Sequence, residues 1–510
     1  MTTSVASMGL FGLDAYPVTV ETDVSTGLPA FDIVGLPGTA VKESRDRVRA
    51  ALKNCGFQYP VSRITVNLAP ADTHKEGPVY DLPILIGILS ATKQIPAPPQ
   101  DAAFLGELSL GGQLRPARGA LAMAIGARDR GFKVIYLPAE NAESAAAVGG
   151  IEIVAVRSVP ELCEMLRGER ERRVVPFCPA RESEVLTGLP DFADVRGQQN
   201  VKRALEIAAA GGHNILMIGP PGAGKSMLAK RLPGILPPMS FDEALEATKV
   251  YSVANALPDG VSLLTARPFR SPHHTISSVG LTGGGSMPRP GEISLAHNGV
   301  LFLDELPEFS KAALEALRQP LEDHTVSITR SNFTLRFPCR ITLVCAMNPC
   351  RCGYLGHPTR HCTCTPAQVA QYRSRISGPL LDRIDLHVDV QPVGYDEMES
   401  RAPGESSAAV RARVVAAREI AQRRMAGEAL TCNAAMGRAE IARYCTPSAE
   451  AAALLKSSYE TLGFTARSYD RILKVARTIA DLAGSERIEA EHVAEAVTYR
   501  SLDRKYFGEL

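Results

Sequence analysis

The sequence predicts an α/β protein of several domains, organised around a parallel sheet with a phosphate-binding loop and ending in a helical region. Three observations lead to this prediction. The loop 219–226 lies between an apolar, strand-like run and a helix-forming segment. A second apolar run, 299–303, ends in two acidic residues. The chain has 510 residues, which exceeds the roughly 250–300 residues that one hydrophobic core supports.

The phosphate-binding loop carries the strongest functional signal. Its glycines allow successive backbone N–H groups to turn toward phosphate oxygens, and the following helix adds a favourable field at its N-terminus. Lys225 supplies a positive charge for the β- and γ-phosphates, and the Ser226 hydroxyl is a ligand for Mg²⁺. The nucleotide-contacting residues predicted here are Gly219, Pro220, Pro221, Gly222, Ala223, Gly224, Lys225 and Ser226.

Composition limits the other functions. The 56 basic and 55 acidic side chains give a net charge of +1, so nucleic-acid binding would require a local basic patch. The sequence shows no pattern typical of a secretory leader and no apolar run near the ~20 residues of a membrane span, which predicts a cytoplasmic protein without membrane association. Four of the eleven cysteines fall within 350–364, an arrangement that favours free thiols or metal ligands over disulfides.

The first 166 residues are predicted to form a separate α/β domain. Short β-rich pieces at 16–22 and 31–34 precede an amphipathic stretch, 39–54, and a strand at 64–68. This alternation indicates a domain with its own core. The charged, proline-containing stretch 167–190 is then predicted to be a linker.

Three segments of this first domain resemble the proteolytic domain of Lon and the Lon-like domain of the recombination factor RadA: 75–83, 106–116 and 136–141. In active Lon-type proteases a serine nucleophile follows the Gly-Pro pair, and a lysine deprotonates it. The corresponding positions here are Val79 and Leu121, which can neither attack a carbonyl nor carry a proton. The resemblance therefore implies a Lon-like fold without peptidase activity, used for assembly or DNA contact. Lys75 and Arg118 remain nearby, either as functional charges or as solvated surface.

A buried strand is predicted at 299–303, because a continuous apolar run suits a strand covered on both faces. Asp304 and Glu305 follow it directly. Asp304 can hold Mg²⁺ together with Ser226, and Glu305 can orient and polarise the water that attacks the γ-phosphate. We expect this pair and the phosphate loop at adjacent strand ends of one sheet.

A third strand, 341–347, ends at Asn348, which resembles the polar sensor residue of AAA+ ATPases. The order of these elements resembles the magnesium-chelatase-like clade of AAA+ ATPases, and within it the YifB/ComM family. This resemblance extends over nearly the whole chain and includes the motifs at 270–274, 283–292, 377–385 and 473–482. The resemblance implies an AAA+ core at 191–392 and a C-terminal helical lid at 393–510.

The same family resemblance implies functional roles for two arginines. Arg383 corresponds to the arginine that reaches the nucleotide of a neighbouring subunit in a ring. Arg467, in a Thr-x-Arg arrangement that opens a helix, corresponds to the second sensor, and Arg471 is the competing candidate. The role of Arg383 implies a ring, which the resemblance makes hexameric.

Two insertions resemble those of replicative helicases in this clade. One spans about 267–292 and the other is a predicted β-hairpin at 325–337 with a Ser-Asn turn. In a ring the tip of such a hairpin faces the pore, where Arg330 could contact a DNA backbone. His273 and His274, in the first insertion, are expected to form hydrogen bonds within their loop rather than to bind metal.

The cysteine-rich loop 350–364 allows two interpretations. Four thiolates can form a tetrahedral zinc site, and the loop has little apolar content to order it otherwise. The Cys-x-Cys spacing is tighter than usual for zinc, so reduced structural or redox-active thiols are the alternative. The ligands would be Cys350, Cys352, Cys362 and Cys364.

The function implied by the resemblance is a Mg²⁺- and ATP-dependent DNA motor that migrates branched DNA during recombination in natural transformation. Its partners would be single-stranded and branched DNA and further copies of the chain. The alternatives are a metal-insertion ATPase of the magnesium-chelatase type and an ATP-dependent protease or chaperone-like remodeller.

Overall fold

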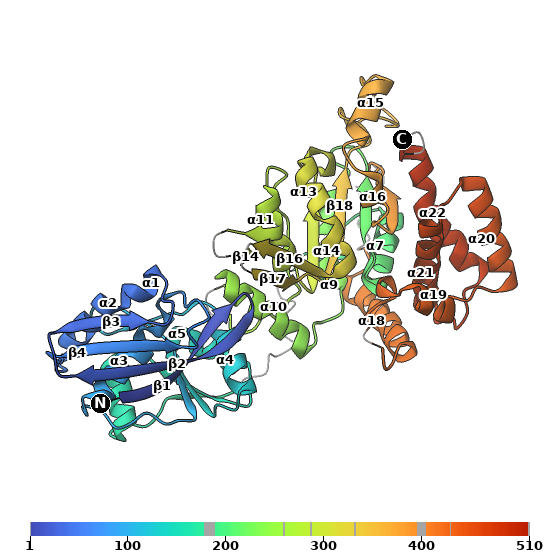
Figure 1. Cartoon of the computed structure of the whole chain (residues 1–510). Coiled ribbons are helices and arrows are strands. Elements are labelled where there is room, and N and C mark those ends of the chain that lie inside the picture. Colours follow the sequence, from blue (N-terminus) through green and yellow to red (C-terminus); the bar gives the residue numbers. More distant parts are fainter. Residues whose placement is uncertain are drawn as a thin grey trace. The chain divides into compact units, whose positions relative to one another are not determined.

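The computed structural model describes residues 2–177, 189–258, 261–285, 288–330, 333–394, 404–428 and 430–507. The chain forms two compact units (Figure 1). Unit 1 comprises Met1–Arg181 and Ser240–Leu264, and unit 2 comprises Glu182–Met239 and Thr265–Leu510. Among the described residues, no helix has both the length and the apolar character needed to cross a membrane.

Unit 1 contains an eight-stranded mixed sheet in the order β10-β9-β8-β5-β1-β2-β4-β3. The long strands β1, β2 and β4 pair antiparallel, whereas β5, β8 and β9 continue the sheet in parallel. The strands are β1 (Thr2–Phe11), β2 (Asp14–Ser25), β3 (Ala30–Val34), β4 (Arg63–Ala69), β5 (Ala102–Phe104), β8 (Val134–Pro138), β9 (Glu152–Val156) and β10 (Val174–Val175), with a separate pair β6 (Glu107–Leu108) and β7 (Leu114–Arg115).

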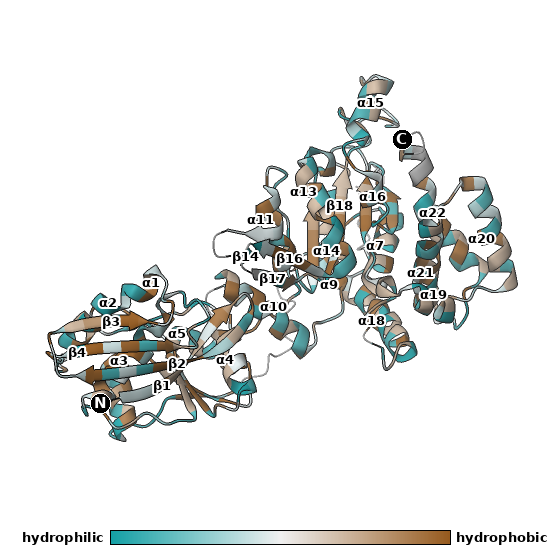
Figure 2. Cartoon of the chain, in the orientation of Figure 1, coloured by the Kyte–Doolittle hydropathy of each residue, from teal (hydrophilic) through white to brown (hydrophobic). Residues whose placement is uncertain are grey.

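Helices cover both faces of this sheet. Successive residues of β8 contribute to different cores: Tyr136 belongs to one buried cluster with α2, α3 and α6, and Ile135 to another with α4 and α5. This is the two-residue period of a strand buried on both sides. Along β4, buried and more exposed residues alternate, and Figure 2 shows that the strand carries both hydrophobic and hydrophilic residues. The helices are α1 (Thr39–Lys42), α2 (Ser44–Asn54), η1 (Pro78–Tyr80), α3 (Asp81–Ala91), α4 (Ala120–Asp129), α5 (Ala139–Ala146), α6 (Val159–Arg167) and α10 (Phe241–Ala254).

Helix α10 is notable because its segment, Ser240–Leu264, packs with unit 1 although unit 2 flanks it in sequence on both sides. The sequence-based boundaries place the same segment inside the ATPase core. A capping box at Ser240 and Glu243 begins the helix. Leu245 then packs on a buried cluster of unit 1, so α10 contributes an apolar side chain to the core of that unit.

Unit 2 is built on a five-stranded parallel sheet in the order β12-β15-β18-β11-β19. All residues of β11 and β15 are buried, as expected for strands covered on both faces. The strands are β11 (Ile215–Ile218), β12 (Phe269–Arg270), β15 (Gly299–Leu303), β18 (Ile341–Met347) and β19 (Leu386–Asp389), and the hairpins are β13 (Gly283–Gly284) with β14 (Arg289–Pro290) and β16 (Thr325–Arg330) with β17 (Phe333–Pro338).

The C-terminal part of unit 2 is helical, as predicted. One buried cluster joins the sheet to α7, α18, α21 and α22. The helices of the unit are η3 (Phe192–Asp194), α7 (Gln199–Gly211), α8 (Lys225–Ala229), α9 (Leu232–Ile235), α11 (Ser278–Thr282), α12 (Glu292–Leu295), η4 (Leu306–Glu308), α13 (Lys311–Ala316), α14 (Arg318–Asp323), α15 (Pro366–Arg373), α16 (Gly378–Leu381), α18 (Ser407–Arg424), η5 (Asn433–Ala435), α19 (Arg438–Tyr444), α20 (Ala449–Leu462), α21 (Ala466–Leu482) and α22 (Ala490–Phe507). The predicted α/β class, parallel sheet and helical C-terminus are confirmed.

Candidate nucleotide site

The phosphate loop connects β11 to α8, the context that the sequence predicts. Its glycines have structural requirements, as Gly224 and Gly219 illustrate. Gly224, which precedes the helix, has φ +89°, a left-handed conformation that residues with a Cβ rarely adopt. A Cβ on Gly219 would lie 2.3 Å from the carbonyl oxygen of Val390, so only glycine allows β11 and the chain after β19 to approach this closely.

Lys225 is buried and reaches across the loop. Its ammonium donates to the carbonyl oxygens of Gly219 at 2.7 Å and Pro220 at 2.9 Å, and to Asn348 Oδ1 at 3.1 Å. Burial lowers the pKa of Lys225 to about 8, and the nearby carboxylates of Asp304 and Glu305 oppose this shift. The ammonium is therefore held by oxygen atoms between the ends of β11 and β18.

Asp304 connects the acidic pair to the phosphate loop. The Ser226 hydroxyl donates to Asp304 Oδ2 at 2.6 Å, and the backbone N–H of Glu305 donates to Oδ1 at 3.0 Å. The expected adjacency of the two strand ends is wrong, because β18 lies between β11 and β15. The side chains nevertheless meet, since the carboxyl ends of parallel strands share one edge of the sheet.

Glu305 has an unusual backbone and a definite partner. Its φ is +54°, a left-handed conformation that is uncommon for a residue with a side chain. Its Oε2 lies 3.2 Å from Nδ1 of His274. The expected hydrogen bond within the loop is present for His273, whose Nδ1 pairs with Thr275 Oγ1 at 2.9 Å, whereas His274 contacts Glu305 outside the loop.

Five of the predicted residues therefore come together at the carboxyl edge of the sheet of unit 2: Lys225, Ser226, Asp304, Glu305 and Asn348. They follow three different strands. The set combines an ammonium, a hydroxyl beside a carboxylate, a second carboxylate and an amide. These are the groups needed to hold a triphosphate, a divalent cation and an attacking water.

Arg383 and Arg467 contact a different group of residues. Arg383 donates to Glu322 and to the carbonyl of Pro379, and its side chain is only 9% exposed. Arg467 lies 3.5 Å from Asp382 and is 65% exposed, while Arg471 pairs with Asp385 at 3.4 Å. The two predicted arginines therefore lie at or next to residues 382–383, and their partners differ from those of Lys225. Thr465 caps α21 by accepting from the backbone of Ser468.

The four cysteines of the loop converge. Their sulfur atoms all lie within 4.8 Å of one another, and three of the pairs are 3.4 to 3.6 Å apart. A tetrahedral site with Zn–S bonds of ~2.3 Å has ligands roughly 3.8 Å apart, so the donor set fits zinc. The loop also contacts the phosphate loop, because a Cβ on Gly353 would lie 2.5 Å from Pro221 Cδ.

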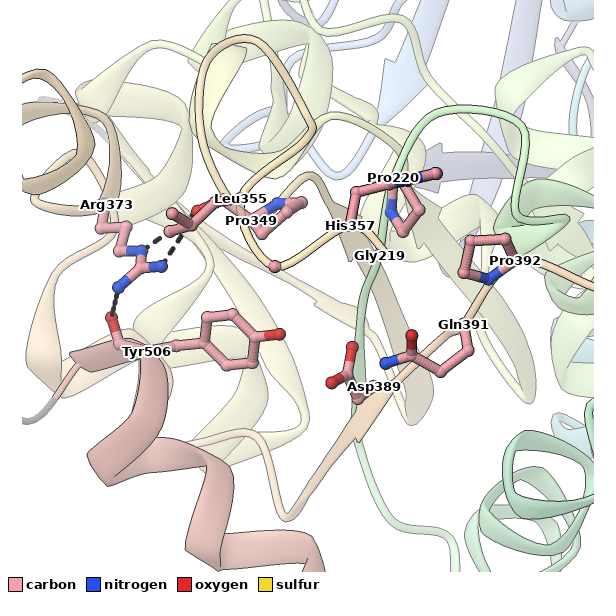
Figure 3. Close-up of a pocket in the computed structure, with 11 residues that line it drawn as sticks. Gly219, Pro220, Pro349, Leu355, His357, Arg373, Asp389, Gln391, Pro392 and Tyr506 are labelled. Carbon is pink, nitrogen blue, oxygen red and sulfur yellow. Dashed lines mark hydrogen bonds between the residues drawn. The ribbon is translucent and has the colours of Figure 1, made fainter. Parts of the chain in front are cut away.

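A pocket of ≈ 290 Å³ lies next to the first residues of the phosphate loop. Figure 3 shows Gly219 and Pro220 on one side, with Pro349 and, from the cysteine-rich loop, His357 nearby. Arg373 donates to the carbonyls of Pro349 and Tyr506. Arg373, which belongs to α15, therefore connects this helix to Pro349 and to α22.

The predicted hairpin is present as β16 and β17. One face is apolar and buried, with Ile328 opposite Leu335. The other face is polar, with Ser327 opposite Arg336. Arg330 donates from Nη2 to the carbonyl of Gly285 at 3.3 Å, which brings the two insertions together. The predicted Ser-Asn turn, 331–332, lies outside the described residues.

In unit 1, the positions that resemble the Lon serine and lysine lie in one apolar environment. Val79 packs against the buried cluster that contains Leu121, and Leu245 of α10 packs on the same cluster. The side chain of Arg118 donates to the carbonyl of Val253 in α10. Lys75 is not solvated surface: it is fully buried, and its Nζ has no hydrogen-bond partner among the described residues.

Comparisons with known proteins match nearly the whole chain. Residues 191–398 match the family described as "Magnesium chelatase, subunit ChlI", and 20–141 and 404–500 match two further families of the same subunit. YifB of Escherichia coli is 45% identical over 507 residues, covering 98% of this chain and 97% of that protein. Competence protein ComM of Haemophilus influenzae is 44% identical over 505 residues, with the same coverage. Lon protease 2 of Bacillus subtilis is 30% identical over 137 residues, covering 27% of this chain and 24% of that protein.

Proposed function

Because the chain belongs to the YifB/ComM family of magnesium-chelatase-like AAA+ proteins, we propose that it is an ATP-driven DNA motor of the cytoplasm. Its hydrolysis would drive branch migration in homologous recombination during natural transformation. The observation that carries the ATPase part is the convergence of Lys225, the Ser226–Asp304 pair, Glu305 and Asn348. The DNA part rests on family membership and on the hairpin.

Each residue of the site takes one role. Lys225 and the backbone N–H groups of its loop bind the phosphates, and Ser226 and Asp304 hold Mg²⁺. When bound, Mg²⁺ neutralises the charge that develops on the phosphate oxygens. Glu305 orients and polarises the attacking water, and Asn348, which already bonds Lys225, orients the γ-phosphate.

Arg383 would complete the nucleotide site of a neighbouring subunit in a hexameric ring. Its contacts with Glu322 and Pro379, rather than with the phosphate loop of its own chain, support this role. Arg467 would be the second sensor, which reaches the γ-phosphate from the helical domain and which pairs here with Asp382. An arginine that arrives from a neighbour compensates charge in the transition state and makes hydrolysis depend on assembly.

DNA would contact the hairpin β16–β17. Arg330 is exposed near its tip, and the polar face presents Ser327, Thr329, Thr334 and Arg336 without a carboxylate. Hydroxyl and guanidinium groups suit a phosphodiester backbone, and such contacts give little sequence preference. The expected partners are single-stranded and branched DNA.

The cysteine cluster would bind one zinc ion in a structural role. Four thiolates close the coordination shell and leave no open position for a reacting water. Elemental analysis of protein purified without chelators under reducing conditions tests this role. About one zinc per chain, lost in Cys350→Ser, is the expected result, and a zinc-free wild-type protein would favour the thiol interpretation instead.

A second candidate, a metal-insertion ATPase, is favoured by the description of the matching families as magnesium chelatase subunits. One experiment distinguishes the two. ATP hydrolysis is measured without DNA and with single-stranded, duplex and four-way-junction DNA, while junction movement is followed separately. Stimulation by DNA together with junction movement supports the DNA motor. Hydrolysis that is indifferent to every DNA would contradict it and favour the chelatase type.

A further inference from the structure

A long stretch of unit 2, 324–381, carries positive charge without any carboxylate. The chain has 55 acidic residues among 510, yet this stretch has none. Its arginines are Arg330, Arg336, Arg340, Arg351, Arg360, Arg373 and Arg375. Such a one-sided charge pattern is typical of a surface that contacts an anionic polymer. The β16–β17 hairpin contains the first two arginines, so the others need a separate explanation.

Two of these arginines lie in the cysteine-rich loop and are exposed. Arg351 has neither a hydrogen-bond nor an ion-pair partner among the residues that the structure describes. Arg360 donates to the Tyr354 hydroxyl at 2.7 Å, and its guanidinium lies 5.1 Å from the centroid of that ring. Arg375, in contrast, pairs with Glu308 at 2.9 Å. No carboxylate of the described residues therefore pairs with Arg351 or Arg360.

Internal contacts give the cysteine-rich loop a defined shape. The Nδ1 atom of His357 accepts from the backbone N–H groups of Thr359 and Arg360 at 3.1 and 3.0 Å. The rings of Tyr354 and His357 meet edge-on with centroids 5.7 Å apart, which braces the ring beneath Arg360. The four cysteines converge and hold the two ends of the loop together. A side chain on an ordered loop loses less conformational freedom when it binds a partner.

The exposed surface of the loop is polar. Thr359 and Thr363 are exposed together with the two arginines. Helix α15 follows the loop directly, and Figure 1 shows this helix beyond the end of β18. Guanidinium and hydroxyl groups without a carboxylate among them suit the oxygens of phosphates. Two sources of phosphate are then conceivable, DNA and ATP, because Gly353 of this loop lies against Pro221 of the phosphate loop.

We propose that Arg351 and Arg360 form a second DNA-contact surface, which binds the phosphodiester backbone apart from the β16–β17 hairpin. The surface holds phosphates and does not read bases. The competing role for the two arginines is to offset the net negative charge of a zinc ion bound by four thiolates. Arg360 bonds the Tyr354 hydroxyl, which favours the DNA role. The inference rests on the proposed DNA motor and adds a contact to it.

The test compares the full-length wild type with Arg351→Ala, Arg360→Ala and a variant that combines both changes. Binding of a labelled single strand of mixed sequence is titrated at several salt concentrations, with a non-hydrolysable ATP analogue present. Each substitution should weaken binding about three- to tenfold near 0.1 M salt and reduce the slope of log affinity against log salt by about one. Arg351→Lys keeps the charge and should bind as the wild type. KM for ATP, measured without DNA, should stay unchanged.

Arg375→Ala is the matched control, because Arg375 belongs to the same stretch and is exposed but already pairs with Glu308; it should leave the salt slope unchanged. Zinc content and oligomeric state are measured on every sample and should match the wild type. If the wild type binds DNA, an unchanged slope in the combined variant would overturn this inference alone. Weaker binding that comes with lost zinc, altered assembly or a raised KM for ATP would also overturn it. A wild type that binds no DNA would overturn both the proposed function and this inference.

Discussion

The chain contains two places where a related protein could carry out chemistry, and they differ in what fills them. In unit 1, Val79 and Leu121 occupy the positions that resemble a Lon serine and lysine, and both pack into apolar surroundings with Leu245. In unit 2, the Lys225 ammonium, the Ser226 hydroxyl and the Asp304 carboxylate occur within hydrogen-bonding distance of polar partners. A fold therefore supplies positions, and the side chains at those positions decide whether there is an active site.

The two buried lysines make the same contrast. Lys225 donates to three oxygens, whereas Lys75 is fully buried and its Nζ has no hydrogen-bond partner among the residues that the structure describes. Burial lowers the pKa of both. A buried charge with arranged partners is typical of a functional site, and one without them is chiefly a cost to folding.

The largest effect is expected at Lys225. Lys225→Ala removes the charge that binds the phosphates, so ATP turnover should fall by at least about 10²-fold. Hydrolysis assays and binding of a fluorescent nucleotide measure this. Lys230→Ala is the control, because Lys230 is exposed just beyond the same helix and should behave as the wild type. ATP hydrolysis retained in Lys225→Ala would contradict the interpretation that unit 2, unlike unit 1, contains an active site.

Arg383→Ala should lose hydrolysis by about 10²- to 10³-fold while nucleotide binding persists, because the arginine acts on a neighbour's transition state. Glu322→Ala removes its partner within the chain and should retain hydrolysis. Mixing Arg383→Ala with Lys225→Ala should restore part of the activity, since each supplies what the other lacks. Equal loss in Glu322→Ala, or no recovery on mixing, would indicate a structural role instead.

At the hairpin, Arg330→Ala should leave hydrolysis without DNA near the wild-type rate and weaken DNA binding. Removing one phosphate contact should reduce the slope of log affinity against log salt by about one. DNA binding titrated at several salt concentrations measures the slope. Arg423→Ala serves as control, because Arg423 is exposed and donates to the carbonyl of Glu419 in its own helix. Unchanged affinity in Arg330→Ala would exclude this residue from the DNA contact.

The smallest effect is expected at Lys75. Lys75→Met should raise the free energy of unfolding by about 1 kcal/mol near neutral pH, because it removes a buried charge that has no hydrogen-bond partner among the described residues. The folded pKa lies below the unfolded one, so the wild type binds fewer protons when folded and gains stability as pH rises toward the ordinary lysine pKa. The Met variant should lack that gain. Denaturant unfolding at several pH values measures both, with exposed Lys53→Met as control.

Local patterns in the sequence were sufficient to predict much of the fold and which residues meet in the candidate nucleotide site. The loop before Lys225, the apolar strand before Asp304 and the strand before Asn348 each have a signal within a few residues. The contacts that sequence reasoning missed are non-local. Nothing near Glu305 indicates that His274 reaches it, and nothing in α10 indicates which unit it joins.

Strand order was missed for the same reason. The spacing between the phosphate loop and the acidic pair does not reveal that β18, which comes later in the chain, inserts between their strands. The burial of Lys75 was also missed, because a lysine beside acidic residues in a loop is usually exposed. In each case tertiary packing, rather than local propensity, decides the outcome.

The most direct test measures both activities on one purified sample. ATP hydrolysis with junction DNA and degradation of casein are followed side by side, for the wild type and for Lys225→Ala. The account predicts DNA-stimulated ATP hydrolysis that Lys225→Ala abolishes, and no casein degradation in either protein. Casein degradation that is lost on mutation in unit 1, or ATP hydrolysis that survives in Lys225→Ala, would contradict it.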